Sequence, residues 1–274
     1  MKNFLCLILV LLIVAPFGGT SFAESFPQEE SLTEDEIKYL LEVVGHTQAE
    51  IENLPVEVAK ELVNSGAIVQ GSHSQLEYFY EPLTDQKSDF LPMATIPASE
   101  LRMGATVYQV TSDRSGFKKF YFYGNWEWLK KPFWTLTDVM TIGWPVSREF
   151  SYPVNNSTGQ VTQHQHRHCT DRYGNGKWEC HPIRYTPYDS FPDAGVAASY
   201  NLVTYSDFTK YKGFISQYAY VPISATGGKL MNVKFEYGHR IILGIPSIGV
   251  YPAGLGIAPE VRTDTRAFNF ELRY

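Results

Sequence analysis

The feature that most constrains the fold is a series of short segments, rich in aromatic and β-branched residues, that recurs from residue 104 to the C-terminus. Gly, Pro, Asp or Ser bounds each segment, which is typical of β-strands. Tyr and Phe, which number 18 and 17, favour half-buried pleated surfaces. Seven segments have this pattern: "ATVYQVTSD", "FKKFYFYGNWEWL", "TLTDVMTIGW", "VAASYNLVTYSD", "GFISQYAYVPIS", "KLMNVKFEYGHRIILG" and "RAFNFELRY". With two arms around the later cysteines they predict about nine strands, in an antiparallel β-sandwich or barrel-like domain over residues 104–274.

The first 23 residues have the pattern of a secretory signal. Lys2 precedes an apolar run from Phe4 to Val14, and Ser21 and Ala23 are small residues at the positions that a signal peptidase reads. An uncleaved N-terminal anchor is the alternative, although the run is short for a bilayer. We therefore predict a secreted, extracellular protein whose mature chain has no transmembrane helix.

An acidic helical module is predicted over residues 24–69. Residues 24–61 hold 11 acids and 2 lysines, whereas the rest of the mature chain is nearly neutral. Thr47 and Glu50 form a capping-box pattern, and Gly45 and Gly66 end apolar helical periodicities. Residues 70–103 contain few periodic features and are predicted to be a linker. The charge is not clustered on a basic face, so we do not expect a nucleic-acid partner.

The stretch "HQHRHCTDRYGNGKWECH", residues 164–181, contains both cysteines that survive signal cleavage. In an exported chain Cys169 and Cys180 are expected to form a disulfide. The Gly-Asn-Gly sequence between them predicts a tight turn, and a register in which paired residue numbers sum to 349 places Cys169 opposite Cys180. A bridge that closes such a short loop is expected to stabilise the protein by roughly 2–3 kcal/mol.

The same register brings four imidazoles to one face of the hairpin, those of His164, His166, His168 and His181. Neutral imidazoles bind Zn²⁺ or Cu²⁺, so this face is a candidate metal site. No carboxylate is placed to orient the rings, and the simpler interpretation is an exposed, solvated hairpin. A face that gains charge below pH 6.5 is the third interpretation. No other cofactor is predicted.

Two further segments suggest binding. Trp126, Trp128 and Trp134 lie in an aromatic stretch that would stack on sugar rings if exposed, or fill the core if buried. Residues 241–259 carry no charge and are interrupted by Pro and Gly, which is consistent with a buried strand pair or with a hairpin that inserts into a membrane.

The sequence contains no recognisable motif for a hydrolase nucleophile, a zinc protease or a phosphate-binding loop. Four scattered acids would suit a glycosidase only if two of them met across a cleft: Glu127, Asp138, Glu149 and Glu236. An enzyme is therefore the less favoured interpretation.

Two stretches, "VVGHTQAEIENLPVEVAKELVNSGAIV" and "FYFYGNWEWLKKPFWTLTDVMTIGWP", carry a resemblance to uncharacterised, secreted β-rich proteins of Gram-positive bacteria. They cover about a fifth of the mature chain. The resemblance implies secretion and a β domain, and it implies no activity and no functional residue.

Together these patterns predict a non-enzymatic secreted or cell-envelope-associated protein. Its aromatic β domain would bind a wall, carbohydrate or protein partner. A polysaccharide-acting hydrolase is the first alternative, and a membrane-active β protein that uses residues 241–259 is the second.

Overall fold

The computed structural model describes residues 31–74, 95–146, 149–191, 193–241, 244–251, 254–258 and 263–274. The predicted signal and residues 75–94 of the predicted linker lie outside the described residues. Leu32–Tyr274 forms one compact unit. No helix in the described part of the chain is long and apolar enough to cross a bilayer.

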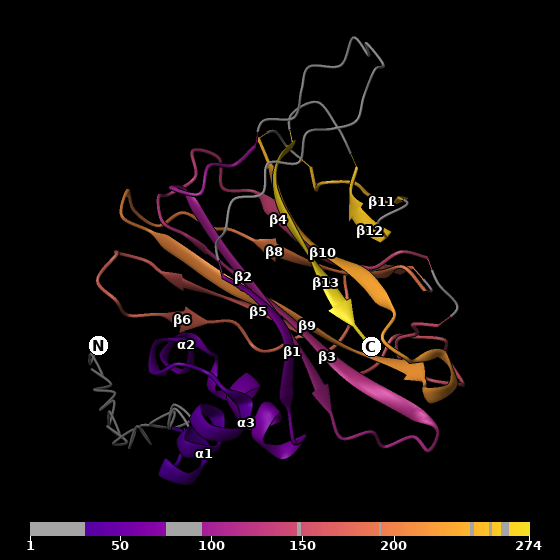
Figure 1. Cartoon of the computed structure of the whole chain (residues 1–274). Helices are drawn as coiled ribbons and strands as arrows, with labels where there is room; N and C mark the ends of the chain where they lie inside the picture. The colour runs from indigo at the N-terminus through magenta and orange to yellow at the C-terminus, as the bar shows by residue number, and fades with distance from the viewer. Residues whose placement is uncertain are drawn as a thin grey trace, which may run out of the picture. The chain divides into compact units, whose positions relative to one another are not determined.

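Two antiparallel sheets face each other and confirm the predicted mainly β architecture (Figure 1). The six-stranded sheet has the order β1-β2-β3-β9-β5-β6, and its strands are Ile68–Ser74, Leu101–Val110, Phe117–Trp128, Lys210–Pro222, His164–Asp171 and Glu179–Cys180. The five-stranded sheet has the order β13-β10-β4-β8-β7, and its strands are Thr263–Arg273, Leu230–Arg240, Thr137–Gly143, Gly195–Asn201 and Asp189–Phe191. All seven segments predicted as strands contribute to these sheets.

The main core lies between the two sheets, because alternate residues of each strand point to the same side. Its largest buried side chains include Trp126, Phe120, Phe122, Trp144 and Phe235. Gly213 on β9 is required here, since a Cβ atom at that position would lie 2.7 Å from the Trp126 ring. The aromatic content that predicted a sheet therefore fills the space between two of them.

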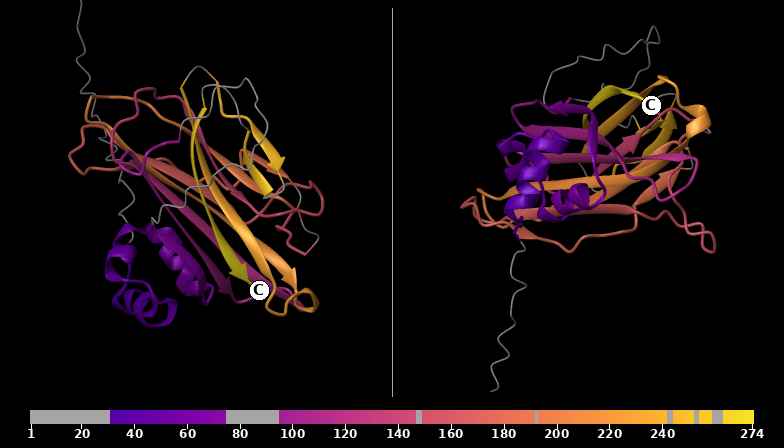
Figure 2. Two further views of the ribbon diagram at one scale, coloured as in Figure 1. Left: turned by 45° about the horizontal axis from the view of Figure 1, so that its top comes forward. Right: turned by 60° about the horizontal axis from the view of Figure 1, so that its bottom comes forward.

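The N-terminal helices pack on the outer face of the six-stranded sheet (Figure 2). They are α1 (Glu34–Tyr39), a π-helical turn (Leu40–Val44), α2 (Gln48–Asn53) and α3 (Val56–Asn64). Leu40, Val58 and Leu62 are fully buried against Tyr108 and Tyr121 of the sheet. Strand β1 begins at Ile68, directly after the helices. The helices thus share a core with the sheet, and the domain boundaries proposed from the sequence stay a prediction.

The uncharged segment 241–259 contains a short hairpin, β11 (Ile248–Tyr251) and β12 (Gly254–Ile257). Leu255 and Ile257 are buried against Val139 and Ala197, on the outer face of the five-stranded sheet. The described part of this segment is therefore a packed strand pair, which was one of the two interpretations. Its insertion into a membrane stays a prediction.

Candidate functional site

The cysteine hairpin has the predicted register. Cys169 pairs with Cys180 across β5 and β6, and the two residues form a disulfide. The Asp171 carboxylate accepts hydrogen bonds from the backbone N–H groups of Asn175 at 3.1 Å and Gly176 at 2.7 Å. Gly174 and Gly176 have φ of 66° and 83°, which glycine adopts without strain. The turn is fixed by its own sequence and closed by the disulfide.

The histidines of β5 face the inside of the sandwich. His164, His166 and His168 have exposed fractions of 0%, 3% and 7%, whereas His181, which follows β6, is exposed. This corrects the prediction that the hairpin presents a solvated polar face. Alternation placed the three imidazoles on one side of the strand, and tertiary packing turned that side toward the five-stranded sheet.

Burial keeps these three imidazoles neutral. Desolvation, with a smaller effect of His166, lowers the pKa of His164 to about 3. Desolvation also lowers the pKa of His166 to about 4, and the Arg184 guanidinium acts in the same direction. For His168, desolvation and the neighbouring His181 lower the pKa to about 4.

The four imidazoles form two pairs. His164 Nε2 lies 2.9 Å from His166 Nδ1, and the rings of His168 and His181 stack with their centroids 4.2 Å apart. Within the described ranges, no group of three or more His, Cys, Asp or Glu side chains is arranged to hold a metal ion. Zn²⁺ or Cu²⁺ binding by these histidines therefore has no support in the geometry and stays a prediction.

The predicted tryptophan surface is divided between core and solvent. Trp126 and Trp128 are only 2% and 3% exposed, and the Trp128 indole N–H donates to the Tyr237 hydroxyl at 3.2 Å. These two residues are core, which corrects their assignment to a binding surface. Trp134 is 49% exposed and lies in the loop that follows β3.

The four acids considered for a glycosidase each have a different partner. Glu127 pairs with Arg102, Glu149 with Lys229, and Glu236 with Lys234. Asp138 is fully buried, and its carboxylate accepts hydrogen bonds from Tyr237 and from His239 Nδ1, at 2.6 and 2.9 Å. Glycoside hydrolysis requires two carboxylates that face each other across a cleft. No two of these four acids are arranged in that way.

Trp134 belongs to a surface that the sequence did not predict. The register places the end of β3, the end of β5 and the start of β9 at one end of the six-stranded sheet, with Glu127 opposite Lys212 and Asp171 opposite Lys210. The loops 129–136, 172–178 and 202–209 therefore meet there. We name this set of loops the aromatic loop surface. Its large exposed apolar side chains are Leu129, Phe133, Trp134, Tyr173, Val203, Tyr205 and Phe208.

Hydrogen bonds hold these loops together. The Thr204 hydroxyl donates to the Thr135 hydroxyl at 2.8 Å, which joins the third loop to the first. The Ser206 hydroxyl donates to the Arg172 carbonyl at 2.7 Å, which joins it to the disulfide-closed hairpin. Lys131 Nζ lies 3.1 Å from the Asp207 carboxylate. The exposed aromatic residues thus stand on a connected framework.

The most exposed apolar side chains of this surface are phenylalanines. Phe133 is 86% exposed and Phe208 is 73% exposed. The three loops carry four basic residues and one acid, Asp207; the basic residues are Lys130, Lys131, Arg172 and Lys177. Ion pairs join Lys130 to Glu100, Lys131 to Asp207 and Arg172 to Glu179, so the surface combines exposed apolar rings with paired charges beside them.

Comparison with known proteins identifies no relative in sequence: no protein family matches the chain, and no characterised protein matches it. Among solved structures, the delta-toxin of Clostridium perfringens matches with a TM-score of 0.33 and 7% identity, over 66% of this chain and 87% of that chain. The NetB toxin of the same organism, in its membrane-inserted form, matches with a TM-score of 0.30 and 8% identity, over 67% and 96%. AvmM, which catalyses macrocyclization in alchivemycin A biosynthesis, matches with a TM-score of 0.24 and 9% identity, over 64% and 88%. Similarity at this level assigns neither a family nor a function, and we base no inference on it.

Proposed function

We propose that the protein is exported and docks on lipid bilayers through the aromatic loop surface, as a non-enzymatic membrane-surface binding protein. The observation that carries the proposal is the exposure of Phe133 and Phe208 on two loops that hydrogen bonds join at one end of the sandwich. Soluble proteins seldom leave large apolar side chains grouped and exposed unless the group contacts a partner or a membrane.

The composition of the surface favours a lipid interface. Tryptophan and tyrosine prefer the headgroup level of a bilayer, phenylalanine enters the region below it, and basic residues interact with anionic headgroups. The surface combines all of these residue types, and its loops carry four basic residues, three of which form ion pairs with acids on or beside the loops. Export is supported by the N-terminal sequence pattern and by the disulfide, which persists in oxidising compartments.

A sugar ligand suits the surface less well. Sugar stacking needs a flat aromatic platform, but the Phe133 and Trp134 rings meet edge to face, with an interplanar angle of 82°. Insertion into an interface does not require rings that share a plane. Trp134 is the one residue of the predicted sugar-binding set that stays accessible, and it contributes here to lipid contact instead.

The test is co-sedimentation with phosphatidylcholine vesicles, with and without phosphatidylserine. The native protein should bind both, and it should bind the anionic vesicles more tightly at low salt because their charge attracts the basic loops. The double variant Phe133→Ser, Phe208→Ser should bind at least about 100-fold more weakly, since each inserted phenylalanine contributes roughly 1.5–3 kcal/mol.

The matched control is the double variant Ile223→Ser, Leu230→Ser. These residues are 54% and 53% exposed, and Ile223 directly follows β9 at its opposite end. This control should bind vesicles as the native protein does. The proposal would be wrong if the native protein bound neither kind of vesicle, or if the two double variants lost binding equally. It would also be wrong if Trp134→Ala abolished binding to an insoluble polysaccharide while vesicle binding was absent.

A further inference from the structure

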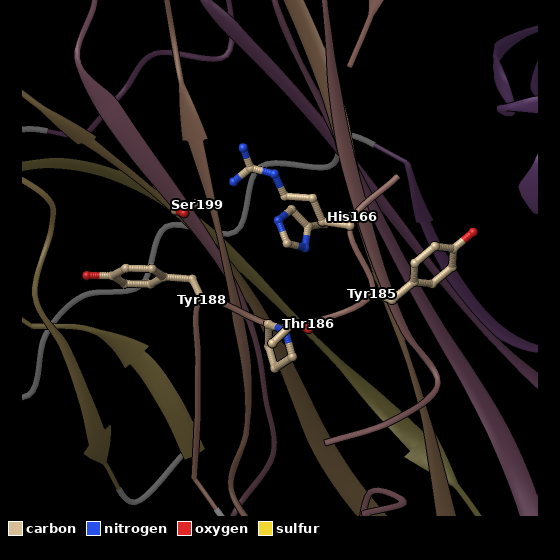
Figure 3. Close-up of a pocket in the computed structure, with 7 residues that line it drawn as sticks. His166, Tyr185, Thr186, Tyr188 and Ser199 are labelled. Carbon is tan, nitrogen blue, oxygen red and sulfur yellow. The ribbon is translucent and has the colours of Figure 1, made fainter. Parts of the chain in front are cut away.

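A cavity of about 450 Å³ is lined by residues of both sheets (Figure 3). His166 of β5 and Ser199 of β8 contribute to its walls, and the segment 184–188 between β6 and β7 forms the rest. Backbone hydrogen bonds in both directions between His166 and Arg184, at 3.0 and 2.9 Å, hold this segment on β5. The volume is typical of sites for small molecules.

The hydrogen bonds behind His166 fix which of its nitrogens carries the proton. The Gln217 amide group donates to the carbonyls of Thr162 and Tyr218, both at 3.0 Å, so its oxygen points to His164. His164 Nδ1–H donates to that oxygen at 3.2 Å, which leaves His164 Nε2 as an acceptor. His166 Nδ1–H donates to His164 Nε2 at 2.9 Å.

This series of hydrogen bonds leaves His166 Nε2 as an unprotonated nitrogen with a free lone pair. His166 is 97% buried, and its Nε2 has no hydrogen-bond partner in the structure. A buried acceptor without a partner is costly, and it is satisfied when a donor enters the cavity beside it. Neighbouring atoms now cover this nitrogen, so the cavity is suited to a ligand that displaces them and brings a hydroxyl or N–H group to it.

Arg184 supplies positive charge to the same cavity. Its guanidinium lies close enough to disfavour protonation of His166 and His168. Within the described residues, Arg184 forms no ion pair with an acid. A guanidinium binds carboxylate or phosphate groups through two parallel hydrogen bonds. The site thus combines a cation for an oxyanion with an acceptor for a hydroxyl.

We propose that this cavity binds a hydroxylated organic anion, with its carboxylate or phosphate on Arg184 and a hydroxyl donating to His166 Nε2. Sugar acids and sugar phosphates have both groups. Thr186, Ser199, Tyr185 and Tyr188 also line the cavity, and the two tyrosine rings point away from His166 on opposite sides (Figure 3). A metal ion does not suit the site, because the guanidinium repels cations and a single imidazole faces the cavity. The site is independent of the lipid-binding surface.

The test is an NMR titration of the intact protein with four probes. D-glucuronate and glucose 6-phosphate carry both groups, D-glucose carries hydroxyls alone, and acetate carries a carboxylate alone. At least one of the first two should bind at least 10-fold more tightly than D-glucose and acetate, with shifts at the His166 ring. The proposal would be overturned if none of the four bound, or if acetate or D-glucose bound as tightly as both of the sugar anions.

Two further measurements separate the roles of the residues. Arg184→Gln should weaken binding of the sugar anion at least 10-fold, whereas Arg273→Gln, at an exposed arginine of β13, should leave it unchanged. Long-range ¹H–¹⁵N spectra of the free native protein should show His166 protonated at Nδ1 and not at Nε2. Equal binding by the two arginine variants, or a proton on Nε2, would refute the proposed site. The double variant Phe133→Ser, Phe208→Ser should bind the sugar anion normally.

Discussion

Strand β5 buries three histidines, while the neighbouring loops expose two phenylalanines. Buried polar groups and exposed apolar clusters are the informative exceptions in a folded protein, because both raise its free energy unless something compensates. His164 is compensated by a complete set of hydrogen bonds, whereas His166 Nε2 is not. Phe133 and Phe208 are 86% and 73% exposed. Each of the two regions is therefore a candidate for contact with another molecule.

Among the tests of this comparison, acidification should change the free energy of unfolding most. The folded-state pKa values of His164, His166 and His168, about 3, 4 and 4, lie below the ordinary value of 6.5. The unfolded chain therefore binds more protons, and stability that is present above pH 6.5 is lost as the pH falls toward 4. Three protons correspond to a slope of up to about 4 kcal/mol per pH unit.

Urea denaturation at pH 7, 6, 5 and 4.5 measures this slope. Most carboxylates titrate below this window, so the decrease between pH 6.5 and 5 reports mainly on histidines. His46 is also buried with a lowered pKa and contributes in the same direction. A folded His168→Phe variant should have a smaller slope. A free energy of unfolding that stayed constant between pH 7 and 5 would contradict the buried, neutral state of His164, His166 and His168.

The second-largest change in the free energy of unfolding is expected from substitution of a buried tryptophan, compared with an exposed one. Trp126→Ala removes a core side chain that is 2% exposed, and we expect a loss of roughly 3–5 kcal/mol in the free energy of unfolding. Trp134→Ala, at a side chain that is 49% exposed, should cost less than about 1 kcal/mol. Chemical denaturation followed by fluorescence measures both. Similar losses in the two variants would show that the loop after β3 is part of the core.

The smallest effect on stability is expected for the phenylalanines. The double variant Phe133→Ser, Phe208→Ser should unfold within about 0.5 kcal/mol of the native protein, because both rings are largely exposed and the contact of Phe133 with Trp134 is itself at the surface. A thermal melt beside the vesicle experiment measures this. A loss above about 2 kcal/mol would mean that these side chains support the fold, and reduced vesicle binding would then have a structural cause.

Much of the fold is readable from local patterns. The strand segments follow from period-two aromatic and β-branched sequence with turn residues between them, and the Gly-Asn-Gly turn with two cysteines gave the hairpin register. Alternation also placed His164, His166 and His168 on one face. It does not say which face turns inward, because Gln165 and Arg167 on the other side of the strand are polar as well.

The candidate sites depend on contacts between distant segments. Gln217 orients His164 from 53 residues away, and Arg184 and Ser199 reach the cavity from separate segments. The aromatic loop surface exists because the chain returns to one end of the sheet three times. The sequence does contain the aromatic residues of this surface, next to Pro132 and in a polar loop, but nothing in the sequence distinguishes them from core aromatics such as Trp126.

The disulfide between Cys169 and Cys180 has a consequence for binding as well as for folding. It closes the hairpin whose Arg172 carbonyl accepts the hydrogen bond from Ser206, so it restricts two of the three loops in the free protein, before the proposed docking on a membrane. A loop that is already ordered loses little conformational entropy on docking, and more of the energy of ring insertion remains as affinity. Reduction of the disulfide would increase the conformational entropy of these loops in the free protein, and docking would then lose more entropy. Membrane affinity would then follow the oxidation state of the surroundings, which would favour docking outside the cell that made the protein.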